Sequence, residues 1–361
     1  MRVLIGFVTV LALWWSTGQP SLATEAPPTV EQQIQELREK LADLEAVLTD
    51  PEGTVKTTEA NVKKVQKVAW SGYLQSRFES VQGSSSRFFV RRARLKLTAK
   101  PTSDVQAVVS ADFGQGKVET KDAFVLWLPG HSPELGPTLA LGQQNWCFGR
   151  EVPVSSSVRE CPERSLWAQK LFKGERDLGL KVTTATGRPL FVEVGVFNGT
   201  GINTSDNNDA KDVVSRVGFA VNPRVDVGAS GYWGSTLVPA AGTTPARTFV
   251  KNRFGADVSV VLLDGVTLKG EWVTARELGR RPDGWQAQLS CNVGKRLVLV
   301  GRFDSYDDDG LSAAGRVDTW AVGFIRYLDS NLRAKVFFES PKESGASVKN
   351  DAVRCELLAS F

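Results

Sequence analysis

The sequence predicts an all-β protein, a 16-stranded antiparallel transmembrane β-barrel with a short N-terminal periplasmic coiled-coil helix. Three observations lead to this prediction. From Val68 to Phe361, apolar and polar residues alternate in short runs, which is the period of a strand with two different faces. The connections between these runs are alternately short and long, as in an up-and-down outer-membrane barrel. The last run, "DAVRCELLASF", keeps its apolar face up to a final aromatic residue, Phe361.

Residues 1–23 have the pattern of a secretory signal peptide. Arg2 supplies the charged region, residues 3–15 form the apolar region, and residues 21–23 ("SLA") give a small-x-small cleavage site. The apolar run is shorter than the ~20 residues that a helix needs to span a bilayer, which argues against an uncleaved anchor. We therefore expect export, and a location in the outer membrane of a Gram-negative cell.

Residues 24–66 are predicted to be a periplasmic coiled coil followed by a linker. The segment "TVEQQIQELREKLADLEAVL" has apolar residues spaced 4-3-4-3-4, the seam of a coiled coil. Pro51 and Gly53 end the helix, and residues 54–66 read as a polar linker. Fewer than three heptads are short for a stable isolated dimer, so we expect something else to gather the chains. The seam residues are Val30, Ile34, Leu37, Leu41, Leu44 and Leu48.

Residues 67–361 are predicted to form the barrel. About sixteen alternating runs follow one another, near residues 68–78, 87–98, 104–113, 120–128, 137–145, 176–184, 189–198, 211–221, 224–234, 247–258, 265–275, 284–292, 295–306, 316–328, 331–339 and 350–361. An open sheet edge in hydrocarbon would be very costly, so the last strand must close against the first. The alternative is a secreted soluble β-protein with aromatic core strands. Against it, six tryptophans fall within or near strand ends, as an interfacial girdle would require: Trp70, Trp127, Trp233, Trp272, Trp285 and Trp320.

The barrel region resembles the phosphate-selective porin O and P family. The resemblance is carried, in order, by "FFVRRARLKLTA", "KDAFVLW", "LALGQQNWCFGRE", "ERSLWAQKLFKGERDLGL", "VEVGVFNGTG" and the terminal Phe361. It implies a 16-stranded barrel, usually a homotrimer, whose third external loop folds inward and narrows the pore. In such proteins the constriction selects anions, and basic side chains bind phosphate.

The longest connection, residues 146–176, is the segment that would form this constriction. Such a long connection in a compact domain is usually functional. It holds six bases and four acids, including the candidate constriction residues Arg150, Arg159, Arg164, Lys170 and Lys173. Cys147 and Cys161 also lie in it, and their spacing together with an oxidising export route predicts a disulfide; two independent thiols are the alternative.

The strongest basic pattern in the wall is "RARLK". Strand alternation points Arg92, Arg94 and Lys96 into the lumen, where converging bases would select anions. Alternatively, these bases form ordinary structural pairs with neighbouring carboxylates. Residues 70–361 carry 37 bases and 31 acids, so the bias toward anions is modest.

The sequence therefore predicts a porin for passive diffusion of small hydrophilic solutes and ions, weakly selective for anions, with phosphate as a candidate. The alternative is a structural outer-membrane anchor whose coiled coil tethers or trimerises it without significant transport. An enzyme is not expected, because the single histidine, His131, lies in a turn-like stretch. We expect no cofactor, metal site or nucleic-acid partner; the expected partners are outer-membrane lipid, small anions such as phosphate and two further copies of the chain.

Overall fold

A computed structural model of the chain describes residues 30–49, 68–129, 136–184, 189–241, 245–310, 315–345 and 348–361. The predicted signal peptide, the linker at 54–66 and His131 lie outside these residues. The chain divides into two units, Met1–Lys64 and Val65–Phe361.

The first unit contains one described helix, α2 (Val30–Thr49), at the predicted position. The described side chains of its apolar seam, Ile34, Leu37 and Leu41, are exposed. Its association into a coiled coil stays a prediction. None of the described helices is long and apolar enough to cross a membrane.

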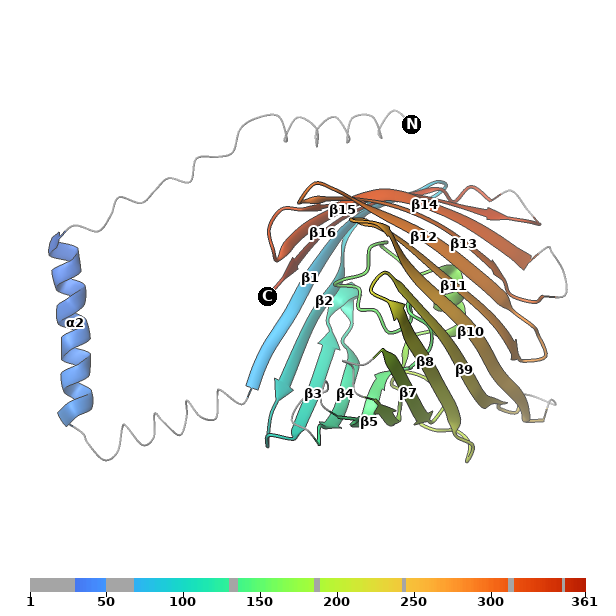
Figure 1. The fold of residues 1–361 in the computed structure, drawn as a ribbon, viewed down its shortest axis with the longest axis horizontal. Helices are drawn as coiled ribbons and strands as arrows, with labels where there is room; N and C mark the ends of the chain where they lie inside the picture. The colour runs from blue at the N-terminus through green and yellow to red at the C-terminus, as the bar shows by residue number, and fades with distance from the viewer. Residues whose placement is uncertain are drawn as a thin grey trace. The chain divides into compact units, whose positions relative to one another are not determined.

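The second unit is a closed antiparallel barrel, which confirms the predicted fold (Figure 1). Within the described residues every strand pairs with its neighbours in sequence, and β1 pairs with β16. The sixteen strands are β1 (Val68–Val81), β2 (Arg87–Ala99), β3 (Val105–Asp112), β4 (Glu119–Trp127), β5 (Thr138–Asn145), β6 (Arg176–Thr183), β7 (Leu190–Phe197), β8 (Asp212–Asn222), β9 (Val225–Val238), β10 (Arg247–Leu263), β11 (Val266–Glu277), β12 (Asp283–Val293), β13 (Leu297–Asp307), β14 (Arg316–Tyr327), β15 (Leu332–Glu343) and β16 (Ala352–Ser360).

The terminal aromatic residue completes the closure. The backbones of Phe361 and Gly72 exchange two hydrogen bonds, of 2.8 and 3.0 Å. A Cβ atom at Gly72 would lie 2.7 Å from the Phe361 ring, so only glycine fits beneath it. The last residue therefore belongs to the wall of the barrel and covers a glycine of the first strand.

The two faces of the wall differ as the alternation predicts. The six tryptophans point outward and are 40–63% exposed, but Trp272 lies in the middle of β11 and not near its end. Inside, buried charged and polar side chains dominate, among them Arg77, Lys335 and Glu356. Such groups are buried at low cost only when paired, and a segment that fills the barrel supplies many of their partners.

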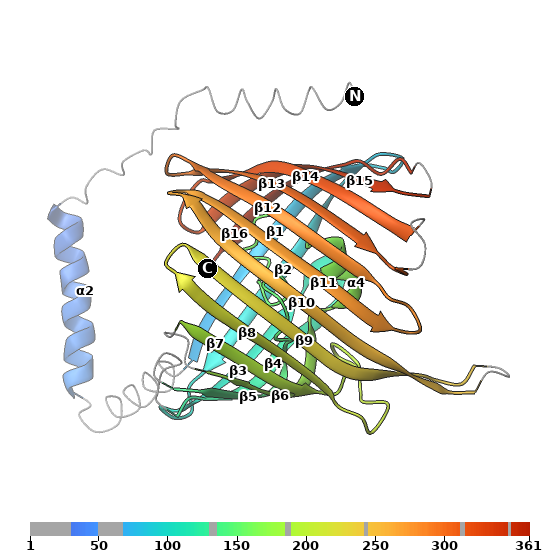
Figure 2. The same ribbon diagram turned by 45° about the vertical axis from the view of Figure 1, so that its right-hand side comes forward.

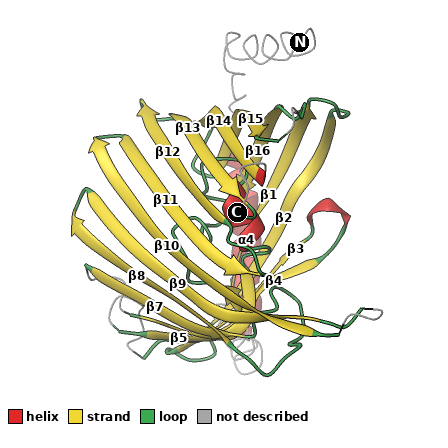
Figure 3. Cartoon of the chain, turned by 90° about the vertical axis from the view of Figure 1, so that its right-hand side faces the viewer, coloured by secondary structure: helices red, strands yellow, loops and turns green. Residues whose placement is uncertain are grey.

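That filling segment is the connection between β5 and β6, residues 146–175, here called the inner loop. This long connection contains a short helix, α4 (Leu166–Leu171). Figures 2 and 3 show α4 inside the ring of strands. A one-turn 3-10 helix, η1 (Gly114–Gly116), connects β3 and β4.

Candidate functional site

The inner loop is held at its base by an aromatic cluster. Its ends meet where Trp146 N donates to Glu175 O over 3.2 Å. The Phe148 and Phe172 rings lie 4.6 Å apart, and Phe172 also contacts Tyr232 of β9 edge to face. These side chains are almost fully buried, so burial of apolar area fixes the start and end of the loop against the wall.

Polar contacts fix the rest of the loop to strands on the opposite side of the barrel. Lys269 of β11 pairs with Glu160 at 2.7 Å. The side chain of Lys335 in β15 donates to Arg159 O at 2.7 Å, and Leu166 N donates to Asp304 of β13 at 3.0 Å. Since these contacts involve strands well separated around the barrel, the loop crosses the interior.

Glu163 connects the loop to the first two strands. It pairs with Arg77 at 2.7 Å and accepts two hydrogen bonds from Arg91 at 2.9 and 3.1 Å. Burial alone would raise the pKa of Glu163, but the guanidinium groups of Arg77, Arg91, Arg92 and Arg159 hold it well below its usual range. The carboxylate is therefore ionised at neutral pH and binds the loop to β1 and β2.

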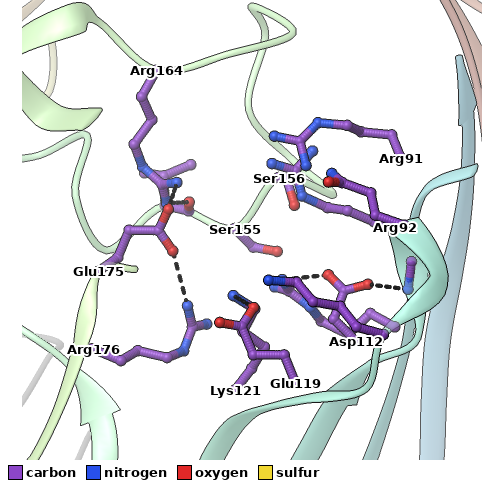
Figure 4. A pocket seen from close by; sticks show the side chains of 15 residues that line it. Arg91, Arg92, Asp112, Glu119, Lys121, Ser155, Ser156, Arg164, Glu175 and Arg176 are labelled. Atoms are coloured by element: carbon purple, nitrogen blue, oxygen red, sulfur yellow. Dashed lines mark hydrogen bonds and ion pairs between the residues drawn. The ribbon is translucent and has the colours of Figure 1, made fainter. Parts of the chain in front are cut away.

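A cavity of about 290 Å³, here called the basic cavity, lies between the inner loop and the wall formed by β2, β3, β4 and the start of β6 (Figure 4). Seven bases and three acids line it, a net charge of +4. The hydroxyl groups of Ser155 and Ser156 add hydrogen-bonding groups from the loop. The bases are Arg91, Arg92, Arg94, Lys117, Lys121, Arg164 and Arg176, and the acids are Asp112, Glu119 and Glu175.

The bases of this cavity differ in how far a carboxylate neutralises them. Arg94 pairs with Asp112 at 3.0 Å, and Arg176 pairs with Asp122 at 2.7 Å. Arg92 donates to the neutral Gln75 at 2.9 Å, while its nearest carboxylate, that of Glu163, is 3.8 Å away. Arg92 is thus the wall base with the least compensated charge among these three.

Three of the eight predicted constriction residues line the basic cavity: Arg92, Arg94 and Arg164. Lys96 is exposed and lies outside it, as does Lys173. The remaining three residues lie elsewhere in the interior. Arg150 pairs with Asp257 of β10 at 3.2 Å, Arg159 is buried against backbone carbonyls of its own loop, and Lys170 lines a second pocket.

The sequence interpretation missed Arg91, Lys117 and Lys121, and it counted Arg176 among the six bases of the loop without naming it as a constriction residue. Strict alternation would point Arg91 away from Arg92. A register shift between Gln75 and Ser76 leaves Arg91 as an extra residue in β2, and it turns inward to Glu163. Lys121 is likewise left as an extra residue by a register shift between Ser110 and Ala111, and it pairs with Glu119 of its own strand. Arg176 begins a strand that the sequence did identify, and it pairs with Asp122 of β4.

The structure contradicts the predicted disulfide, because Cys147 and Cys161 are free thiols. Cys147 packs in the aromatic cluster and contacts Val214 O, whereas Cys161 packs against Val300, Ile325 and Phe337 and contacts Gln288. Their spacing made closure easy, but the wall contacts hold the two thiols in different apolar clusters. Burial raises the pKa of Cys147 to about 12 and that of Cys161 to about 11, so both stay protonated at neutral pH.

Among the described residues, no group of His, Cys, Asp and Glu side chains has the arrangement of a metal site. What the arrangement offers is a set of fixed cationic side chains around a polar cavity inside a barrel. Such a set can attract and orient an anion.

Comparisons with known proteins agree on the fold. The solved structures similar to this chain include the Vibrio cholerae outer membrane protein OmpT in a trimer form (12% identity, TM-score 0.62, 81% of this chain and 99% of that chain). Another is Salmonella typhi OmpF in complex with daunomycin (12% identity, TM-score 0.61, 81% of this chain and 97% of that chain). A third is an anion-selective porin from Comamonas acidovorans (13% identity, TM-score 0.56, 81% of this chain and 99% of that chain). At these identities the likeness shows the fold alone. No curated protein matches the sequence.

The model of one protein family, phosphate-selective porin O and P, matches residues 64–251, more than half of the chain. Family and fold together indicate an outer-membrane channel rather than an enzyme, and this chain belongs to the phosphate-selective porin O and P family.

Proposed function

We propose that this protein is a channel for passive diffusion of small hydrophilic solutes and ions with a weak preference for anions, and that the inner loop is its constriction. The observation that carries the proposal is the basic cavity, where seven bases and three acids surround about 290 Å³ of space between loop and wall. A net charge of +4 in a narrow, poorly screened passage favours anions over cations. Arg92, Arg94 and Arg164 are the residues of the original prediction that we assign to this passage.

Phosphate is the candidate anion, since arginine forks suit its oxygens. Family membership supports this candidate, and the anion selectivity named for the Comamonas acidovorans porin supports the coarser preference. The preference is expected to be weak, because Asp112, Glu119 and Glu175 offset part of the positive charge.

We also infer the arrangement of the mature protein in the cell. Residues 1–23 act as the signal peptide, residues 24–66 as a periplasmic coiled coil with its linker, and residues 67–361 as the barrel in outer-membrane lipid. A homotrimer is supported by the trimer form of the structurally similar OmpT. Three parallel copies of α2 would then be gathered by their barrels, which suits a helix of fewer than three heptads.

The test uses the purified full-length mature protein in a planar lipid bilayer. A salt gradient of potassium chloride should give a reversal potential of the sign expected for chloride preference, and phosphate should reduce the chloride current with saturation. Cation preference would overturn the anion proposal, and unaffected chloride current at high phosphate would remove phosphate as the favoured anion. A folded protein without any conductance would favour the alternative role as a structural anchor.

A further inference from the structure

A second pocket lies on the opposite side of the inner loop from the basic cavity. It has a volume of about 510 Å³ and lies between α4 and the inner face of β13, β14 and β15. Arg164 contributes to both spaces, but its guanidinium group donates to carbonyl groups of Val152 and Val154 and pairs with Glu175, on the side of the basic cavity (Figure 4). The loop therefore separates two spaces in the lumen.

The second pocket has unused hydrogen-bond acceptors. Within the described part of the chain, Glu339 Oε1, Asn350 Oδ1 and Asp304 Oδ2 are buried and have no hydrogen-bond partner. Asp304 is 1% exposed and Glu339 7% exposed. Asp304 Oδ2 lies 3.2 Å from Arg302 Nε without hydrogen-bond geometry, and the second oxygen of Glu339 pairs with Arg354. Buried acceptors of this kind are usually satisfied, so these three call for a donor from a bound solute or water.

The charge of this pocket has the opposite sign to that of the basic cavity. Four acids line it: Asp304, Asp308, Glu339 and Glu343. With the guanidinium group of Arg164 directed to the other side, Arg302 and Lys170 are the bases in the lining. From outside the lining, Arg354 pairs with Glu339 and Arg280 pairs with Asp308. The remaining lining is partly apolar, with Leu166, Tyr306 and Val317 available to contact a short alkyl chain.

We propose that this pocket binds small organic cations that carry a primary ammonium group. An ammonium group has three donors and no acceptor, which matches a pocket whose unpaired atoms are mainly oxygens. Charge-assisted hydrogen bonds to Asp304 Oδ2 and Glu339 Oε1 would supply the donors that these two oxygens lack, in addition to the ion pairs with Arg302 and Arg354. Solutes of opposite charge would then occupy opposite sides of the inner loop, which goes beyond the anion preference proposed above.

Ethylammonium chloride is the probe, and saturation-transfer NMR on the detergent-solubilised full-length protein measures its binding without depending on conductance. We expect saturable binding of ethylammonium. Tetramethylammonium, which has charge but no N–H donor, and glycerol, which has donors but no charge, should neither bind nor compete. Equal binding of tetramethylammonium would show that the pocket attracts cations by charge alone. Competition by glycerol would show that the pocket binds hydroxylated solutes. Either result would overturn the proposed ammonium site.

Two substitutions in the pocket should each weaken ethylammonium binding by about tenfold or more, D304N and E339Q, because each removes one charge-assisted hydrogen bond. The matched control is Glu193→Gln, a lumen-facing carboxylate of β7 that pairs with Lys181 and lines neither space. Binding within twofold of the parent in both pocket variants would refute the assignment.

A third variant does not depend on buried partners. Lys170 is exposed at the rim of the pocket, and K170Q removes a repulsive charge, so it should strengthen ethylammonium binding by about two- to threefold. Weaker or unchanged binding in a K170Q barrel that keeps the parent's heat-modifiable gel mobility would contradict the proposal. Because NMR reports binding in a silent channel as well, failure of the anion-channel proposal would remain distinguishable from failure of this one.

Discussion

Replacement of Arg92 by glutamine should lower the preference for anions more than any comparable change at a paired arginine. Arg92 lines the basic cavity and is 8% exposed. Its 2.9 Å hydrogen bond goes to a neutral amide, and the closest carboxylate oxygen is 3.8 Å away. Removing this guanidinium therefore removes charge that the wall does not already compensate.

The size of the effect follows from the dimensions of the basic cavity. A sphere of 290 Å³ has a radius of about 4 Å, so an ion at its centre lies about 6 Å from a guanidinium group in the wall. At that distance a unit charge in water contributes about 0.7 kcal/mol, and screening at 0.1 M salt leaves about 0.4 kcal/mol. An anion loses this stabilisation and a cation loses an equal repulsion, so the anion-to-cation permeability ratio should fall about three- to fourfold.

The assay is the reversal potential of single channels under a tenfold gradient of potassium chloride. Arg224→Gln is the matched control, since Arg224 is exposed in a short turn and pairs with Asp264. The control should leave the permeability ratio unchanged. An R92Q channel whose permeability ratio equals that of the parent would show that ions do not pass the basic cavity.

Three further outcomes are expected. The E163Q substitution breaks a buried pair with Arg77 and Arg91, which costs about 3–5 kcal/mol. Amide hydrogen exchange in the inner loop should therefore accelerate at least about a hundredfold, whereas the control E193Q should leave the exchange rate unchanged. Unchanged exchange in E163Q would mean that Glu163 does not hold the loop. The folded-state pKa values of Glu163 and Glu175 are lowered, so the stability that they give to the loop is complete above their ordinary pKa of about 4.5 and is lost only as pH falls through the lower folded values. Protection of the loop amides from hydrogen exchange should therefore stay constant from pH 7 to pH 5 and decline in stronger acid. A loss of protection near pH 6 would contradict the assignment. Mass spectrometry after denaturing alkylation without reductant should find Cys147 and Cys161 fully modified, and a modified fraction that rises only after reduction would restore the disulfide.

Much of the fold could be read from the sequence because the physics of a barrel wall repeats along each strand. Lipid outside and water inside impose a period of two, and this period located all sixteen strands and the outward direction of Trp70 and Trp320. The inner loop was found from the sequence as the longest connection between strands. Its length singled it out before any contact was known.

The candidate site was harder to predict because it depends on contacts between distant segments. A single extra residue in β2 turned Arg91 inward, and alternation has no means to signal such a bulge. Lys170 and Arg150 lie in the same loop as Arg164, yet the path of the loop directs all three to different surroundings. For Cys147 and Cys161, the spacing in sequence indicates only how easily a disulfide could close the loop. It does not indicate which strands of the wall each thiol contacts.

The pairing of β1 with β16 has a consequence for assembly. Arg77 of the first strand bonds to Glu356, 279 residues later, and the same arginine holds Glu163 of the inner loop. We expect this seam to close late in folding, since the pair between Arg77 and Glu356 cannot form until the final strand docks. An unfinished barrel would present a charged, unpaired edge, so we expect nascent chains to depend on assistance in the envelope that shields this edge until the ring is sealed.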